Sequence, residues 1–123
     1  MAEVIEDVAE VSNSILLSVK KSLGIPPSVL SFDADLILLI NSVFAELHQL
    51  GVGPEEVFFI EDDGSSWDEF ITGDVINMVR AYMFLEVKLM FDPPTSAVIT
   101  AMEKKRDEYE WRLNVAGDKS VFG

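Results

Sequence analysis

Residues 33–51 read DADLILLINSVFAELHQLG, and this stretch decides the fold of the chain. Asp33 and Asp35 place negative charge where it complements a helix dipole, and Gly51 provides a C-terminal stop. The apolar side chains between them cover more than one face, so the predicted helix should contact neighbours on several sides. These side chains are Leu36, Ile37, Leu38, Leu39, Ile40, Val43, Phe44, Ala45, Leu47 and Leu50.

A second helix is predicted over residues 74–91, which read DVINMVRAYMFLEVKLMF and are also apolar nearly all round. Pro93 and Pro94 end it, because proline cannot continue the helical hydrogen-bond ladder. In a chain of 123 residues much of each helix lies near the surface. Two such helices therefore indicate either burial against another chain or a central antiparallel pair covered by the other helices. The pattern leaves both open.

Shorter helices are predicted from their caps and stops. Ser12, Asn13 and Ser14 are all competent N-caps and Gly24 is a C-terminal stop, while Ser66 and Glu69 have the spacing of a capping box. Thr95 or the residue after it begins the last helix, which follows the two prolines. The expected spans are 14–23, 67–71 and 96–114.

The remaining segments have no helical pattern that continues these elements. Between the two apolar helices lies a long central loop, in which the apolar run 57–60 predicts either a short strand or an anchor that pins the loop. Residues 1–13 are expected to form an N-terminal arm and residues 115–123 an extended C-terminal tail. We therefore expect a single all-α domain over 1–123, a small bundle of four to five helices.

Composition argues against most enzymes. The chain has no cysteine and a single histidine, His48, which excludes disulfides, thiolate sites and multi-histidine metal cages. Acids are adjacent at 61–63 and lack the alternate spacing of a calcium loop. We therefore predict no catalytic residue, no metal ligand and no cofactor. A small hydrolase using carboxylates is a rival that would require a pocket with perturbed acids.

Charge is distributed unevenly along the chain, whose formal net charge is −13. No Lys or Arg occurs between Lys21 and Arg80, and the middle of the protein should therefore be strongly negative. Such a surface repels nucleic acid, which is useful where DNA must slide past without sticking. The part expected to form an acidic lumen or partner face, called the acidic face below, comprises Glu55, Glu56, Glu61, Asp62, Asp63, Asp68 and Glu69.

Most of the chain, from about residue 16 to residue 114, resembles a family of small tailed-phage proteins, the head-tail connector or head-completion proteins. Residues 82–96, YMFLEVKLMFDPPTS, and 110–114, EWRLN, carry the more distinctive part of the resemblance. The N-terminal half is similar through 19–24 and 33–54. None of these segments is a chemical motif, so the resemblance implies a structural role and no activity.

The resemblance implies a subunit of a ring, a dodecameric one, at the virion neck, where it lines the DNA channel. The implied partners are further copies of the chain, the portal protein and a tail-side neck or stopper protein; DNA passes without specific binding, and no membrane is involved. The protein would be made in the host cytoplasm. Because the family's C-terminal part reaches toward the portal, we expect portal or partner contacts from Trp111, Arg112, Asn114, Val115, Val121 and Phe122.

The alternative is an acidic helical binding module that occupies a basic protein as a DNA mimic. The two hypotheses differ in assembly. A mimic should be a monomer or dimer with scattered carboxylates, whereas a connector should form rings or require a portal.

Overall fold

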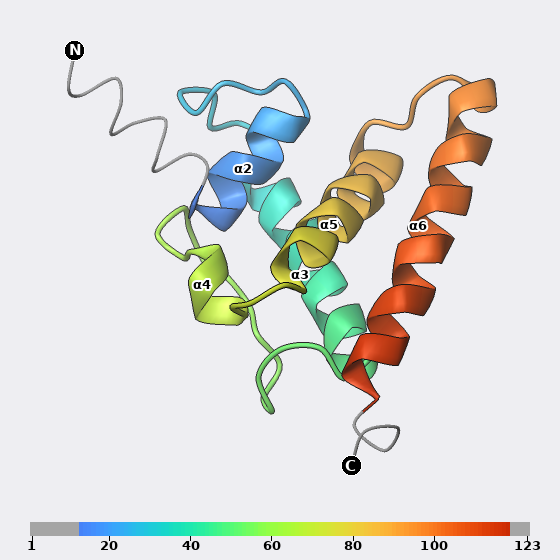
Figure 1. The fold of residues 1–123 in the computed structure, drawn as a ribbon. Helices are drawn as coiled ribbons and strands as arrows, with labels where there is room; N and C mark the ends of the chain where they lie inside the picture. The colour runs from blue at the N-terminus through green and yellow to red at the C-terminus, as the bar shows by residue number, and fades with distance from the viewer. Residues whose placement is uncertain (1–12, 119–123) are drawn as a thin grey trace.

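The computed structural model describes residues 13–118, so the expected N-terminal arm lies almost wholly outside the described residues. Over this range the predicted all-α bundle is confirmed (Figure 1). Two of the predicted caps form: the Ser14 hydroxyl accepts from the Leu17 N–H at 3.2 Å, and the Glu69 carboxylate accepts from the Ser66 N–H. Thr95 stands at the N-cap of the last helix, but its side chain makes no capping hydrogen bond. The helices are α2 (Ile15–Ser22), α3 (Asp33–Gln49), α4 (Trp67–Phe70), α5 (Ile76–Phe91) and α6 (Ser96–Gly117).

Helices α3 and α5 form the centre of the bundle, with α2 and α4 on one side and α6 on the other (Figure 1). This arrangement confirms the central pair that the sequence left as one of two alternatives. Fully buried side chains from both helices build the core, among them Phe44, Leu47, Tyr82 and Met83, and Trp67 of α4 joins them. Nevertheless several large apolar side chains stay exposed on the described chain, so self-association remains a prediction.

No strand forms at residues 57–60 in the described chain, and the alternative interpretation, an anchor, is what the structure has. Ile60 is buried, and both of its backbone groups bond to the side-chain amide of Asn41 on α3. Because one amide satisfies the N–H and the C=O together, Ile60 needs no neighbouring strand.

Helix α6 extends to Gly117, so residues 115–117 are helical and do not belong to an extended tail. The reason lies in a close approach of two backbones. A Cβ atom at Gly117 would collide with the Leu50 carbonyl oxygen, so only glycine lets the last turn of α6 lie on the end of α3. None of the described helices combines the length and hydropathy that a membrane span needs.

Candidate functional site

The C-terminal half of α6 presents an apolar surface to solvent. Leu113 is fully buried, while Trp111 is 68% exposed and Val115 is 41% exposed. Residues two apart lie about 200° apart around a helix, so burying Leu113 turns its neighbours at both sides outward. The structure therefore places Trp111 on the surface.

Polar members of the expected contact set lie beside this tryptophan. Arg112 and Asn114 are exposed, and the Arg112 guanidinium forms an ion pair with Glu108 one turn earlier at 2.7 Å. Residues Val121 and Phe122 lie outside the described residues. The structure thus brings Trp111, Arg112, Asn114 and Val115 onto the exposed part of one helix end.

Buried polar contacts hold α6 in place. Arg106 of α6 donates to the buried Glu86 carboxylate of α5 at 2.6 Å, and this bond raises the pKa of the arginine above its usual value. Next to it, the Tyr82 hydroxyl donates to Glu46 of α3 at 2.8 Å. Burial, followed by the charge of Glu86, raises the pKa of Glu46, and burial also raises the pKa of the Tyr82 phenol. These contacts link α3, α5 and α6, so the surface around Trp111 rests on a rigid support.

The acidic face lies on the loop between α3 and α4 and on α4 itself. All seven of its carboxylate side chains are exposed, as the sequence predicted from their charge. None of them forms an ion pair with a cation in residues 13–118. Their charge is therefore not compensated within the described chain.

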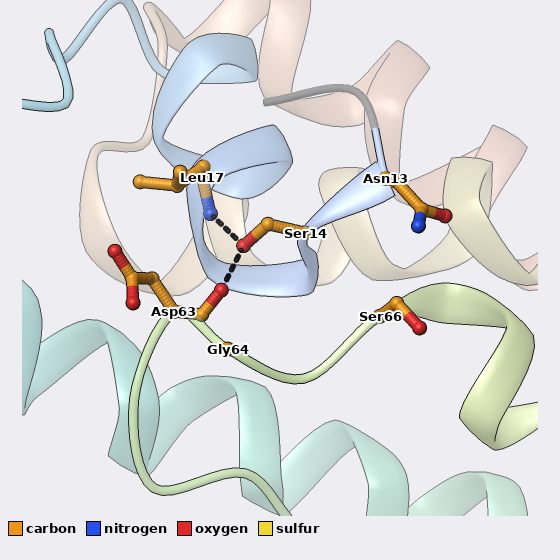
Figure 2. Close-up of a pocket in the computed structure, with 6 residues that line it drawn as sticks. All are labelled: Asn13, Ser14, Leu17, Asp63, Gly64 and Ser66. Atoms are coloured by element: carbon orange, nitrogen blue, oxygen red, sulfur yellow. Dashed lines mark hydrogen bonds between the residues drawn. The ribbon is translucent and has the colours of Figure 1, made fainter. Parts of the chain in front are cut away.

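Several contacts fix the loop that carries these acids. Figure 2 shows the Ser14 hydroxyl of α2 donating to the backbone carbonyl of Asp63 at 2.8 Å, while the Asp63 carboxylate points away from this bond. Earlier in the loop, the Phe58 ring packs edge-on against Phe44 of α3, with 5.0 Å between ring centroids, and against Phe70 of α4, with 5.4 Å between them. The acidic face is accordingly a shaped surface rather than a set of independent side chains.

The sequence model of the family described as "Phage connector protein" matches residues 15–120. The chain belongs to the phage connector protein family. No curated protein and no solved structure matches it. Membership makes this connector a structural phage protein that is associated with the virion and interacts with other head and tail proteins.

The connector also has an exposed apolar patch that the sequence reasoning missed. Leu30 is 69% exposed and Phe32 is 41% exposed, and the Phe32 ring meets Phe91 at the end of α5 at 5.5 Å. Met90, next to Phe91, is 44% exposed. The one available signal was the run of apolar residues just before Asp33, outside the predicted helix.

In the part of the chain that the structure describes, no three acidic or histidine side chains are placed to hold a metal ion. The ring of His48 is exposed and its Nε2 atom lies 2.9 Å from the Glu55 carbonyl oxygen, so this histidine supports the loop.

Proposed function

We propose that this connector forms a ring at the head-tail junction, between the portal protein and a tail-side neck protein, with DNA passing through its centre. Family membership supports a connecting role, and the shape of the molecule supports contacts in more than one direction. A closed ring requires two different surfaces on each subunit, because each copy meets its neighbours head to tail. The exposed apolar side chains of Leu30, Phe32 and Met90 supply one of these two surfaces.

The exposure of Trp111 carries the portal-docking part of the proposal. A tryptophan that is 68% exposed on a well-anchored helix is costly to leave in water and is typical of a binding hot spot. Val115 lies one turn further along the same helix, and Arg112 supplies a charged neighbour for the rim. We therefore assign this helix end to the portal contact.

The acidic face is assigned to the DNA channel. Seven exposed carboxylates without described ion pairs would repel the phosphates of passing DNA, which keeps the duplex from binding the wall. The same charges would give a DNA mimic its function. The particle mass of the connector, measured first without and then with the portal protein, separates the two hypotheses.

Light scattering of the purified connector, alone and after mixing with its cognate portal protein, tests the proposal. A ring alone, or a complex with one connector per portal subunit, is the expected result. A connector that stays monomeric or dimeric and ignores the portal would contradict the proposed function and favour the mimic.

A matched pair of valine variants tests the assigned surface. Trp111→Ala should weaken portal binding about 30-fold, equivalent to about 2 kcal/mol, and Val115→Ala should weaken it in the same direction. Val98→Ala is the control, since Val98 lies at the other end of α6 and has a similar exposure, 48% against 41% for Val115. Equal effects of the two valine variants would place the portal contact elsewhere.

A truncation tests the tail separately. Ending the chain after Asn114 would also remove Gly117 and its packing on the end of α3, so the fold itself would be disturbed. Ending it after Asp118 removes only residues 119–123, with Val121 and Phe122 among them. If these residues contribute to docking, this shorter form keeps its thermal stability and binds the portal more weakly. Unchanged binding would restrict the contact to α6.

A further inference from the structure

A hollow of about 380 Å³ lies between α2 and α5, and none of its lining residues belongs to the surfaces assigned above. Its α2 wall consists of Ser18, Lys21 and Ser22, and its α5 wall consists of Arg80 and Phe84. The hollow therefore combines two cations, two hydroxyl groups and an aromatic ring. Nothing in the connector role described above uses it.

The two cations of this hollow are unusual in so acidic a protein. In the described chain Lys21, Arg80 and Lys104 make no ion pair, whereas every other lysine and arginine of residues 13–118 does. Two of these three cations line the same hollow. With a net charge of −13, carboxylates are abundant, and yet none of the described ones reaches this place.

Arg80 is held in position by rings rather than by a carboxylate. Its guanidinium lies over the Trp67 ring at 5.5 Å and over the Phe84 ring at 5.9 Å. Such contacts orient the guanidinium and leave its N–H donors available for a carboxylate. The fitting ligand is therefore an acidic segment that also carries apolar side chains to place against Phe84.

We propose that residues 3–10 of the same chain, EVIEDVAE, occupy this hollow, with their carboxylates pairing with Lys21 and Arg80. The segment lies outside the described residues and has the required chemistry, four acids together with valines at helical spacing. The proposal concerns a surface distinct from the portal contact and does not depend on the ring.

The place where the described chain starts supports an occupant from the same molecule. Asn13 and Leu17 line a neighbouring hollow at the start of α2 (Figure 2), and Leu17 is followed one turn later by Lys21. The distance along α2 from Asn13 to Lys21 is about 12 Å at the rise of an α-helix. Asp7 precedes Asn13 by six residues, which span up to about 20 Å when extended, so its carboxylate reaches the hollow.

The other acidic segment of the chain is a poorer candidate within one molecule. This segment is residues 61–63, whose Asp63 carbonyl accepts a hydrogen bond from the Ser14 hydroxyl at the start of α2. The bond holds these residues at the opposite end of α2 from Lys21. Tethering favours the N-terminal segment further, because a linked ligand acts at a high effective concentration.

A spin label tests the proposal on the full chain. The protein has no cysteine, so Ala2→Cys creates a unique labelling site that leaves all four carboxylates of the segment intact. Amide signals of Lys21, Ser22 and Arg80 should lose about half of their intensity or more through paramagnetic broadening, and that of Lys104 on α6 should not. Broadening should diminish in high salt, which screens the ion pairs.

Four variant proteins and one mixing experiment decide the outcome. Arg80→Gln should abolish the broadening at Lys21, whereas Arg80→Lys should retain part of it and Lys104→Gln all of it. If Arg80→Gln perturbs the fold, a variant that combines Glu3→Gln, Glu6→Gln, Asp7→Asn and Glu10→Gln makes the same test without touching the hollow. Broadening that survives neutralisation of the segment, or no broadening at the hollow, would overturn the proposal. The mixing experiment combines protein that carries the spin label at natural isotope abundance with ¹⁵N-enriched protein that carries no spin label. Broadening in this mixture would assign the hollow to the segment of another copy and would also overturn the proposal.

Discussion

The Nζ atom of Lys20 lies 2.8 Å from the Oδ1 atom of Asp33, and the lysine side chain is fully buried. The same ammonium group donates to the carbonyls of Pro27 at 3.2 Å and Val29 at 2.6 Å. Two backbone carbonyls thus accept from the ammonium group and the Asp33 carboxylate balances its charge, which offsets the cost of burying it. This one side chain connects the end of α2, the α2–α3 connection and the start of α3.

Lys20→Met should destabilise the connector by about 3 kcal/mol, because it leaves the Asp33 carboxylate without its cation and two backbone carbonyls without their donor. Chemical denaturation measures the loss. Lys104→Met is the matched control, since Lys104 is exposed and makes no ion pair with a described residue, and it should change stability by less than about 0.5 kcal/mol. A Lys20→Met protein of normal stability would show that the buried pair contributes little.

Removing the Asn41 amide should loosen the central loop. Its Nδ2 donates to the Ile60 carbonyl at 3.0 Å and its Oδ1 accepts from the Ile60 N–H at 2.8 Å, so Asn41→Ala leaves two backbone groups unpaired at a cost of about 2 kcal/mol. Hydrogen exchange at residues 57–63 should accelerate more than exchange in α6. Ser42→Ala, at the exposed neighbouring position, should leave both rates unchanged. Uniform acceleration along the chain would mean that the loop has no local anchor there.

Glu46 gives the stability of the connector a pH dependence whose sign follows from its raised pKa. A carboxyl that binds its proton more tightly in the folded state contributes stability at low pH, and that contribution is lost as the pH rises above 4.5 through the folded-state pKa. Glu46→Gln keeps an acceptor for the Tyr82 hydroxyl and removes the charge. At pH 7 it should therefore stabilise the protein by about 0.5 kcal/mol, a small gain because solvent screens this partly exposed group.

Thermal unfolding of the Glu46→Gln variant and of the unchanged protein between pH 4 and pH 7.5 measures the difference in their stability, which should grow with pH. Glu103→Gln, at an exposed position on α6, is the control and should produce no such trend. A gain for Glu46→Gln that is constant across this pH range would contradict the assignment.

Reversing charge on the acidic face separates a DNA-facing surface from a partner surface. In phage that carry Glu61→Lys, Asp62→Lys and Asp63→Lys together, head-tail joining should be normal and DNA release slower, because the lysines bind phosphates that the acids repel. Counting joined particles and timing DNA release measure the two effects. Glu103→Lys, at an exposed position on α6 outside the acidic face, is the control and should change neither effect. Loss of joining with normal release would assign the acidic face to a protein partner.

Local chemistry was sufficient to predict the helices from the sequence. Caps such as Ser14 and Ser66, stops such as Gly24, and the prolines after Asp92 act on neighbouring residues, so their effects can be read without the fold. The same holds for the acidic face, because consecutive acids without partners in the sequence remain at the surface.

Tertiary structure alone decided which of the apolar and charged side chains are hidden. Lys20 and Lys21 are adjacent in sequence, but Lys20 is buried with three partners while Lys21 lines an open hollow, because α2 turns one toward Asp33 and the other toward Arg80. Likewise Trp67 and Trp111 are the same residue type but differ in burial. Trp67 is buried because α4 packs into the core, and Trp111 is exposed because it lies on the outward face of α6. By itself the sequence determined the helices and the distribution of charge, whereas the end of α6 depended on the close approach of Gly117 to Leu50. Which side chains remain available to a partner was decided by contacts between residues far apart in the chain, whose pairing no local pattern encodes.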